Sequence, residues 1–234
     1  MNCSDKITRE QLCRMFDHTN LKAYADKDML QTLCEEAKEN HCAMVAINSS
    51  PVSYCKELLK DTDIHVGAAI SFPLGQTTVA AKVFEAQNAI ENGADEIDYV
   101  INIGELKNKN YQYIESEMKA MVELCRSNKV ISKVTFEICY LTEDEIKKVS
   151  EIAKKVKPDY IKTSTGFGTS GAVKEIVRLM KNCVGEDVKV KAAGGIRSWK
   201  TCAEMIDAGA ERIGTSSTIK ILQEFDEVRA GKSI

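Results

Sequence analysis

Residues 187–215 read DVKVKAAGGIRSWKTCAEMIDAGAERIGT, and this stretch decides the fold. The valine-rich run 187–192 predicts a strand, the segment 198–208 has the pattern of a helix, and 211–214 predicts a second strand. Gly209 directly follows the predicted helix, where a glycine commonly ends one. Two strands joined through one helix form a parallel βαβ unit.

The same alternation of strand and helix extends through the rest of the chain. Thr8 and Gln11 form a capping-box pattern that predicts a short leading helix at 8–16, and Thr142 is a candidate N-cap. We expect the remaining elements as strands at 17–21, 42–47, 64–70, 95–101, 130–138 and 159–163, and as helices at 26–40, 51–60, 77–92, 110–127, 143–156, 171–182 and 216–225.

Eight successive strand–helix units imply a parallel sheet of the α/β class. In a chain of 234 residues they suit a closed (β/α)8 TIM barrel, here with a short N-terminal helix. A doubly wound open sheet is the alternative, because one misread strand would break closure. No linker composition interrupts the pattern, and the chain has only three prolines, so residues 1–234 are expected to form a single domain.

Composition excludes several classes of function. The net charge of −3 gives no global attraction to nucleic acid or to an anionic membrane. Nine cysteines without a CxxC pair fit a reducing, cytoplasmic setting better than a disulfide framework. The N-terminal residues lack the apolar segment of a secretory signal, and no apolar run approaches membrane-spanning length.

Two lysines are the strongest chemical signal. Lys162 and Lys191 each end a predicted strand just before small residues, and functional groups of a barrel collect at the carboxyl ends of its strands. If the strands are neighbours, burial and like charge disfavour protonation, so one amine becomes a nucleophile able to form a Schiff base. Two other interpretations stay open: both lysines are ordinary solvated residues, or both hold a phosphate.

Asp98 lies in an apolar strand and shares one strand face with Glu96, Val100 and Asn102. A carboxylate that faces the barrel interior needs a partner, which Lys162 or Lys191 could supply directly or through water. It would serve either as a buried ion pair or in proton transfer. The same period of two predicts that Glu96 and Lys189 lie one layer deeper and approach each other.

Glycine-containing loops follow the last three predicted strands, at 165–168, 194–197 and 214–217. Backbone N–H groups in such loops, together with a helix N-terminus, can bind phosphate, although each loop alone would more simply be a tight turn. His18, His41 and His65 do not form a metal-binding pattern, and we expect His65 to pack in the core. We expect no catalytic metal and no cofactor.

Several segments, in this order, resemble the deoxyribose-phosphate aldolase family over nearly the whole chain. They are Asp17-His18-Thr19, Phe72-Pro73-Leu74-Gly75, residues 93–98 (GADEID), residues 100–104 (VINIG), residues 161–167 (IKTSTGF), residues 190–197 (VKAAGGIR) and residues 212–217 (RIGTSS). The resemblance implies a class I aldolase that cleaves 2-deoxy-D-ribose 5-phosphate reversibly to D-glyceraldehyde 3-phosphate and acetaldehyde through a lysine Schiff base.

The resemblance also implies roles for individual residues. Lys162 would form the Schiff base, Lys191 would lower its pKa, and Asp98 would transfer protons. The implied substrate-binding residues are Asp17, Thr19, Thr165, Gly166, Phe167, Gly194, Gly195, Gly214, Ser216 and Ser217. The resemblance suggests a homodimer acting on small-molecule substrates.

The chain departs from the family pattern at Asn20, Ala46 and Ser49, which could change the preference for the aldehyde. Two alternative functions are another Schiff-base aldolase on a phosphosugar-binding barrel and a phosphometabolite-binding protein without catalysis. The lysine pair and Asp98 argue against the second.

Overall fold

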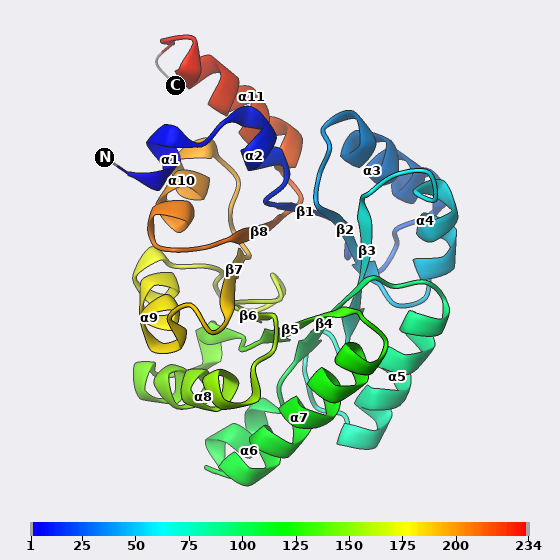
Figure 1. Ribbon diagram of the computed structural model, residues 1–234, viewed down its shortest axis with the longest axis vertical. Helices are drawn as coiled ribbons and strands as arrows, with labels where there is room; N and C mark the ends of the chain where they lie inside the picture. Colours follow the sequence, from blue (N-terminus) through cyan, green and yellow to red (C-terminus); the bar gives the residue numbers. More distant parts are fainter. Residues whose placement is uncertain (1, 233–234) are drawn as a thin grey trace.

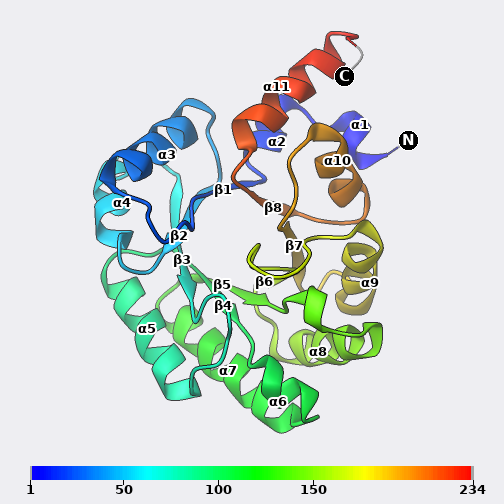
Figure 2. The same ribbon diagram turned by 180° about the vertical axis from the view of Figure 1, so that it is seen from behind.

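A computed structural model describes residues 2–232, and its eight strands close into a parallel barrel in chain order. The first strand pairs with the last, so the TIM-barrel prediction is confirmed and the open doubly wound sheet is excluded. Figures 1 and 2 show the strands at the centre of a ring of helices. The strands are β1 (Phe16–Thr19), β2 (Met44–Asn48), β3 (His65–Ile70), β4 (Glu96–Val100), β5 (Ile131–Thr135), β6 (Tyr160–Lys162), β7 (Lys189–Ala193) and β8 (Arg212–Thr215).

The ring of helices begins with two short N-terminal ones, which lie beside the last two helices of the chain (Figure 1). Within residues 2–232, none of the helices combines the length and apolar character that a membrane span requires. The helices are α1 (Cys3–Lys6), α2 (Arg9–Cys13), α3 (Lys27–Glu39), α4 (Val52–Leu58), α5 (Val79–Glu91), α6 (Ile103–Lys107), α7 (Tyr111–Ser127), the 3-10 turn η1 (Ile138–Tyr140), α8 (Glu143–Val156), α9 (Lys174–Val184), α10 (Trp199–Asp207) and α11 (Thr218–Arg229).

The element boundaries differ from the prediction where side chains or backbone strain intervene. The Thr8–Gln11 capping box is confirmed, but the leading helix ends at Cys13. Helix α6 was not predicted, and the Asn102 side chain caps it by accepting a hydrogen bond from the Glu105 N–H. Strand β5 ends at Thr135 rather than 138, because Glu137 adopts a left-handed conformation that a strand cannot continue.

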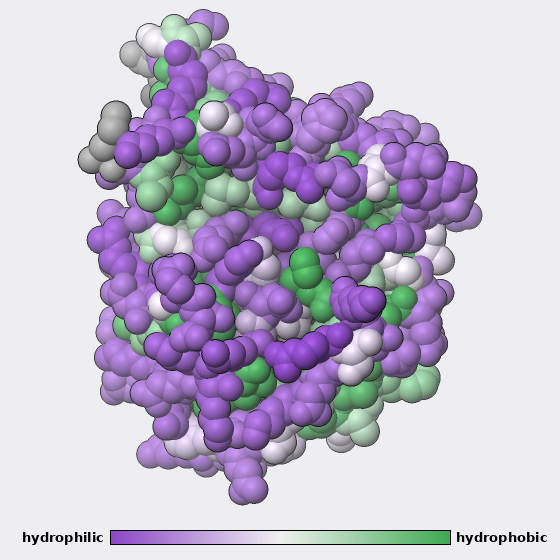
Figure 3. Space-filling view, viewed as in Figure 1, coloured by the Kyte–Doolittle hydropathy of each residue, from purple (hydrophilic) through white to green (hydrophobic). Residues whose placement is uncertain are grey.

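The two faces of the strands have different chemistry. Outward-facing residues such as Val45, Ile97 and Val190 pack under the helices in the hydrophobic core. The inward faces carry a set of buried charged side chains instead, namely Asp17, Glu96, Asp98, Lys133, Lys162, Lys191 and Arg212. On the face shown in Figure 3, hydrophilic residues predominate and apolar ones form small patches. Most of the apolar burial therefore lies between strands and helices, which leaves the barrel interior available for polar chemistry.

A buried ion pair fixes the loops beyond β3 and β4. Lys82 on α5 and Glu117 on α7 are both fully buried, with Nζ and Oε1 2.6 Å apart. The same ammonium group donates to the carbonyls of Gly75 and Val100, and the other Glu117 oxygen accepts the Asn102 N–H at 3.0 Å. The pair thus anchors the backbone immediately after the strand that carries Asp98.

Replacing Lys82 alone should be strongly destabilising. In Lys82→Met, the carboxylate of Glu117 stays buried without its partner, which typically costs about 3–5 kcal/mol. Urea denaturation followed by circular dichroism measures this loss. The matched Lys82→Met/Glu117→Met variant should recover most of it, and an equal loss in both variants would contradict this account.

Candidate active site

Neighbouring strands bring the two predicted lysines together. Lys162 on β6 and Lys191 on β7 are register partners, and both side chains are buried. Their Nζ atoms contact the same atom, Oδ2 of Asp98, at 2.7 and 2.6 Å. The structure therefore joins the three residues in one hydrogen-bonded group at the carboxyl end of the barrel.

The protonation of Lys162 is shifted toward the neutral amine. Burial is the main cause, and with the positive charges of Lys191 and Lys133 it outweighs the attraction of Asp98, lowering the pKa of Lys162 to about 8. Desolvation therefore contributes more than the like-charge crowding predicted from the sequence. Burial alone would raise the pKa of Asp98, but the surrounding lysines hold that pKa well below its usual range.

Below this group, further charged residues fill the barrel interior. Lys191 also contacts Asp17 Oδ2 at 2.5 Å, and Arg212 donates to Asp17 Oδ1 at 2.6 Å. Lys133 reaches Asp98 Oδ1 at 2.9 Å. The charged residues thus form one continuous network that extends from the pocket toward the amino end of the strands.

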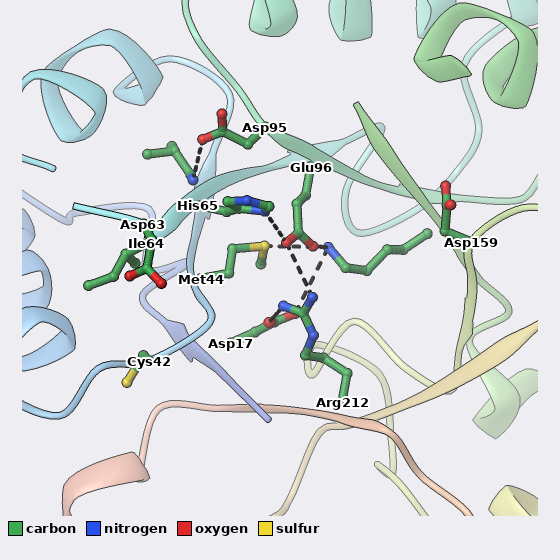
Figure 4. Close-up of polar contacts among 12 residues, drawn as sticks. Asp17, Cys42, Met44, Asp63, Ile64, His65, Asp95, Glu96, Asp159 and Arg212 are labelled. Carbon is green, nitrogen blue, oxygen red and sulfur yellow. Dashed lines mark hydrogen bonds and ion pairs between the residues drawn. The ribbon is translucent and has the colours of Figure 1, made fainter. Parts of the chain in front are cut away.

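Glu96 occupies the deepest layer, but its predicted partner was wrong. Glu96 contacts Lys133. It also lies 3.3 Å from Arg212 and 2.7 Å from His65 (Figure 4). Lys189 is exposed at the start of β7, where its ammonium group lies over the ring of Tyr160. The alternation of side chains along the strand correctly placed Lys189 on the same face as Lys191. At the start of β7, however, this face of the strand is exposed to solvent.

The prediction that His65 packs in the core was also wrong. Its side chain is 43% exposed at the amino end of β3, and Nδ1 contacts Glu96. His18 is buried instead. Its two ring nitrogens form hydrogen bonds with Thr218 and Glu36, so that His18 connects β1 with α11 and α3. Within residues 2–232, no three His, Cys, Asp or Glu side chains are grouped as a metal site would need.

A pocket of about 480 Å³ opens above the lysines. Asp17, Asp98 and Ser217 do not line it, because the two carboxylates lie beneath the lysines and Ser217 lies at the start of α11. The other residues implied by the family resemblance do line it: Thr19, Lys162, Thr165, Gly166, Phe167, Lys191, Gly194, Gly195, Gly214 and Ser216.

One wall of the pocket was not predicted. It comes from the loop after β1 and from α3, and Lys22 in that loop adds a basic group to the pocket, which Arg197 of the predicted loop after β7 also lines. The strand-end rule could not find the α3 residues, because they lie on a helix that only the barrel's curvature brings to its mouth. The unpredicted lining residues are Leu21, Lys22, Met29, Thr32, Leu33 and Glu36.

The loops after β6 and β7 pack backbone against backbone. The Ala172 N–H donates to the Gly194 carbonyl at 3.0 Å, and Gly166 and Gly194 both have positive φ angles that favour glycine. Buried Glu137 accepts hydrogen bonds from the N–H and the hydroxyl of Thr165. On this side of the pocket, the rim therefore includes backbone groups that hydrogen bonds hold in place.

The three departures from the family pattern lie in different surroundings. Asn20 and Ala46 line the pocket. Ser49 does not line it and donates instead to Glu85 at 3.0 Å, which also accepts the Ser71 N–H at 2.8 Å. Ser49 therefore supports the loop after β3, and a direct effect on the aldehyde would have to come from the other two.

A closed barrel with a buried lysine pair at its carboxyl end defines a TIM-barrel enzyme whose chemistry can use an amine nucleophile. The model of the DeoC/LacD family aldolases matches residues 12–224. The chain belongs to this family.

Relatives agree in sequence and in structure. A deoxyribose-phosphate aldolase of Lactobacillus acidophilus is 58% identical over 93% of this chain and 92% of its own. A deoxyribose-phosphate aldolase of Thermococcus kodakarensis is 48% identical over 93% of this chain and 98% of its own. The solved deoxyribose phosphate aldolase from Aeropyrum pernix, described as tetrameric, has a TM-score of 0.89 and 27% identity over 96% of this chain and 95% of its own.

Gly171 tests the packing of the two loops. A Cβ at this position would lie 2.1 Å from the Gly194 carbonyl oxygen, so Gly171→Ala should displace the loop after β7. We expect a loss of about 1–3 kcal/mol, typical of overpacking, measured by thermal denaturation. Gly104→Ala is the control, because its Cβ would approach only side-chain atoms, the nearest being Asn102 Oδ1 at 3.3 Å. Equal stability of the two variants would contradict the close contact.

Proposed function

We propose that this protein cleaves 2-deoxy-D-ribose 5-phosphate reversibly to D-glyceraldehyde 3-phosphate and acetaldehyde, as a class I aldolase. The observation that carries the proposal is Lys162, a buried lysine with a pKa of about 8 that lines the pocket and contacts Asp98. Family membership and the names of the relatives support the same substrate.

The reaction would begin with attack of the neutral Lys162 amine on the C1 aldehyde of the open-chain sugar. Loss of water leaves a protonated imine, which withdraws electrons from the C2–C3 bond. Removal of the C3 hydroxyl proton breaks that bond, releases glyceraldehyde 3-phosphate and leaves an enamine. Protonation at C2 and hydrolysis then release acetaldehyde and restore the amine.

Asp98 and Lys191 would move the protons, with a water molecule bridging to the substrate. The low pKa of Asp98 makes the isolated carboxylate a weak base. Its 2.6 Å contact with Lys191 gives the pair both an acceptor and a donor beside Lys162. Asp17 lies beneath Lys191 and would hold that ammonium group in place.

The phosphate would bind at the glycine loops above the lysines. Gly166, Gly194, Gly195 and Gly214 offer closely approachable backbone, and Ser216 and Ser217 precede α11. The position of Gly214 also matters for Lys191, because a Cβ there would come within 3.1 Å of its Cε. Binding of the remote phosphate would position C1 over Lys162.

Borohydride trapping tests the assignment of the nucleophile. With acetaldehyde and borohydride, mass spectrometry should find a reduced two-carbon adduct on Lys162, and Lys162→Ala should lose at least about 10³-fold in turnover because no imine can form. Lys189→Ala is the matched control and should keep both the adduct on Lys162 and the activity. Lys189 is exposed at the amino end of β7, away from the pocket at the carboxyl end of the barrel. Substantial activity in folded Lys162→Ala would reject the assignment.

The pKa of Lys162 predicts a pH profile. Below pH 8 the amine is mostly protonated, so its reactivity should rise about tenfold per pH unit and level off above the pKa of about 8. Competitive labelling with acetic anhydride, read by mass spectrometry, follows the neutral fraction. A midpoint near 10.5, the value of an ordinary lysine, would contradict a perturbed site.

Two alternative functions remain distinguishable. A different Schiff-base aldolase would form the adduct but prefer another acceptor in a panel of aldehydes tested with acetaldehyde. A phosphometabolite-binding protein would bind the sugar phosphate without forming an adduct. The Lys162–Asp98–Lys191 group favours catalysis over binding alone, because phosphate recognition does not need a carboxylate buried between two lysines.

We further propose that residues 1–234 act as a single domain and that the protein works in the cytoplasm as a homodimer. The closed barrel and the long family match support one domain. Nine free cysteines support a reducing compartment. The homodimer rests on the family resemblance, and light scattering of the purified protein would distinguish it from the tetramer described for the Aeropyrum pernix protein.

A further inference from the structure

We propose that Glu96 and Arg212, which lie outside the pocket, are positioning residues that tune the reactivity of Lys162 through the charge balance of the barrel interior. This inference deepens the proposed function and rests on it. Neither residue lines the pocket, and both are buried at the deep end of the charged network. Their influence on the amine would therefore be exerted through other side chains.

The contacts form an unbroken path from Glu96 to Lys162. Glu96 contacts Lys133, which lies 2.9 Å from Asp98 Oδ1, and the other oxygen of Asp98 lies 2.7 Å from Lys162. A second path starts at Arg212, which contacts Asp17 at 2.6 Å, and Asp17 contacts Lys191 at 2.5 Å. Figure 4 shows Arg212 between Glu96 and Asp17, where it links the two paths.

The charges in this network balance without Lys162. Three carboxylates, Asp17, Glu96 and Asp98, face three cations, Lys133, Lys191 and Arg212. The network is therefore neutral when Lys162 is neutral, and a proton on Lys162 adds one uncompensated positive charge to a buried space. Such a charge is costly in a low-dielectric interior, which favours the amine form.

Other titratable groups around the network lie at its edges. His65 contacts Glu96 from the half-exposed amino end of β3. Glu137, beyond β5, lies near Lys162 but is engaged by Thr165. Tyr160 on β6 has its ring 5.3 Å from the Arg212 guanidinium. None of them interrupts the path from Glu96 and Arg212 to Lys162.

The deep part of the network, formed by Glu96 and Lys133, acts through fixed charge and does not conduct protons. Burial opposes the charge on Glu96, yet Lys133, His65 and Arg212 hold its pKa far below the usual range. Burial likewise opposes the charge on Lys133, and Asp98, Glu96 and Asp17 raise its pKa above the usual value. Groups that hold their charges this firmly do not exchange protons near neutral pH, so their influence on Lys162 is electrostatic.

Two substitutions that remove charges of opposite sign test whether Glu96 and Arg212 tune Lys162. Glu96→Gln removes a negative charge and should lower the labelling midpoint of Lys162 by about half a pH unit or more. Arg212→Gln removes a positive charge and should raise the midpoint by a similar amount. The Glu96→Gln/Arg212→Gln variant restores neutrality, and its midpoint should return close to that of the unsubstituted protein. Acetic anhydride labelling, read at Lys162 by mass spectrometry, provides the midpoint.

A purely structural role predicts a different pattern. Loosened packing would shift both single variants in the same direction or leave the midpoints unchanged, and either result in folded protein overturns the proposal. If either single variant does not fold, His65→Lys tests the same electrostatic effect on the labelling midpoint of Lys162, because His65 lies half-exposed at the amino end of β3. It places a fixed positive charge beside Glu96 and should lower the midpoint relative to His65→Gln, more strongly at low salt. An unchanged midpoint there also overturns the proposal.

The failure of the proposed function would look different. It would show as the absence of any acetaldehyde adduct on Lys162 in the unsubstituted protein, whatever the labelling midpoints of the variants. An adduct combined with unmoved midpoints would leave the aldolase assignment intact and reject only the charge-balance role of Glu96 and Arg212.

Discussion

The carboxylate of Asp98, buried among three lysines, is the interaction on which the site depends. One of its oxygens contacts Lys162 and Lys191, and the other contacts Lys133. Without this carboxylate, three buried ammonium groups would face one another. With it, one buried anion holds two cations in place and accepts a hydrogen bond from the third amine, whose pKa still falls to about 8 because Lys162 is buried beside Lys191 and Lys133.

Burial and neighbouring charges change the pKa of Lys162 by different amounts. Desolvation is the larger cause of its lowered pKa, and the neighbouring lysines add to it. Asp98 opposes both, so the carboxylate that positions the amine also limits how far its pKa falls. This compromise fits a nucleophile that must be neutral in a useful fraction near pH 7 and still be held by a hydrogen bond.

Much of the fold could be predicted because helix and strand periods alternate regularly and glycines mark the joints between them. The Gly93 and Gly209 joints show this: each has a positive φ, and each is followed by an acidic residue paired with a lysine, Lys56 or Lys181. Helix α6 and the early end of β5 could not be predicted, because they depend on a side-chain cap and on one left-handed residue.

The sequence by itself determined the order of the elements, the inward faces of the strands that carry Asp98 and Lys191, and most of the residues at the carboxyl end of the barrel. These follow from local periodicity, which needs no knowledge of distant contacts. Only the tertiary structure decided which charges meet. Lys133 and Arg212, not Lys189, became the partners of Glu96, because strand register and depth within a closed barrel set which long side chains reach one carboxylate and which reach water.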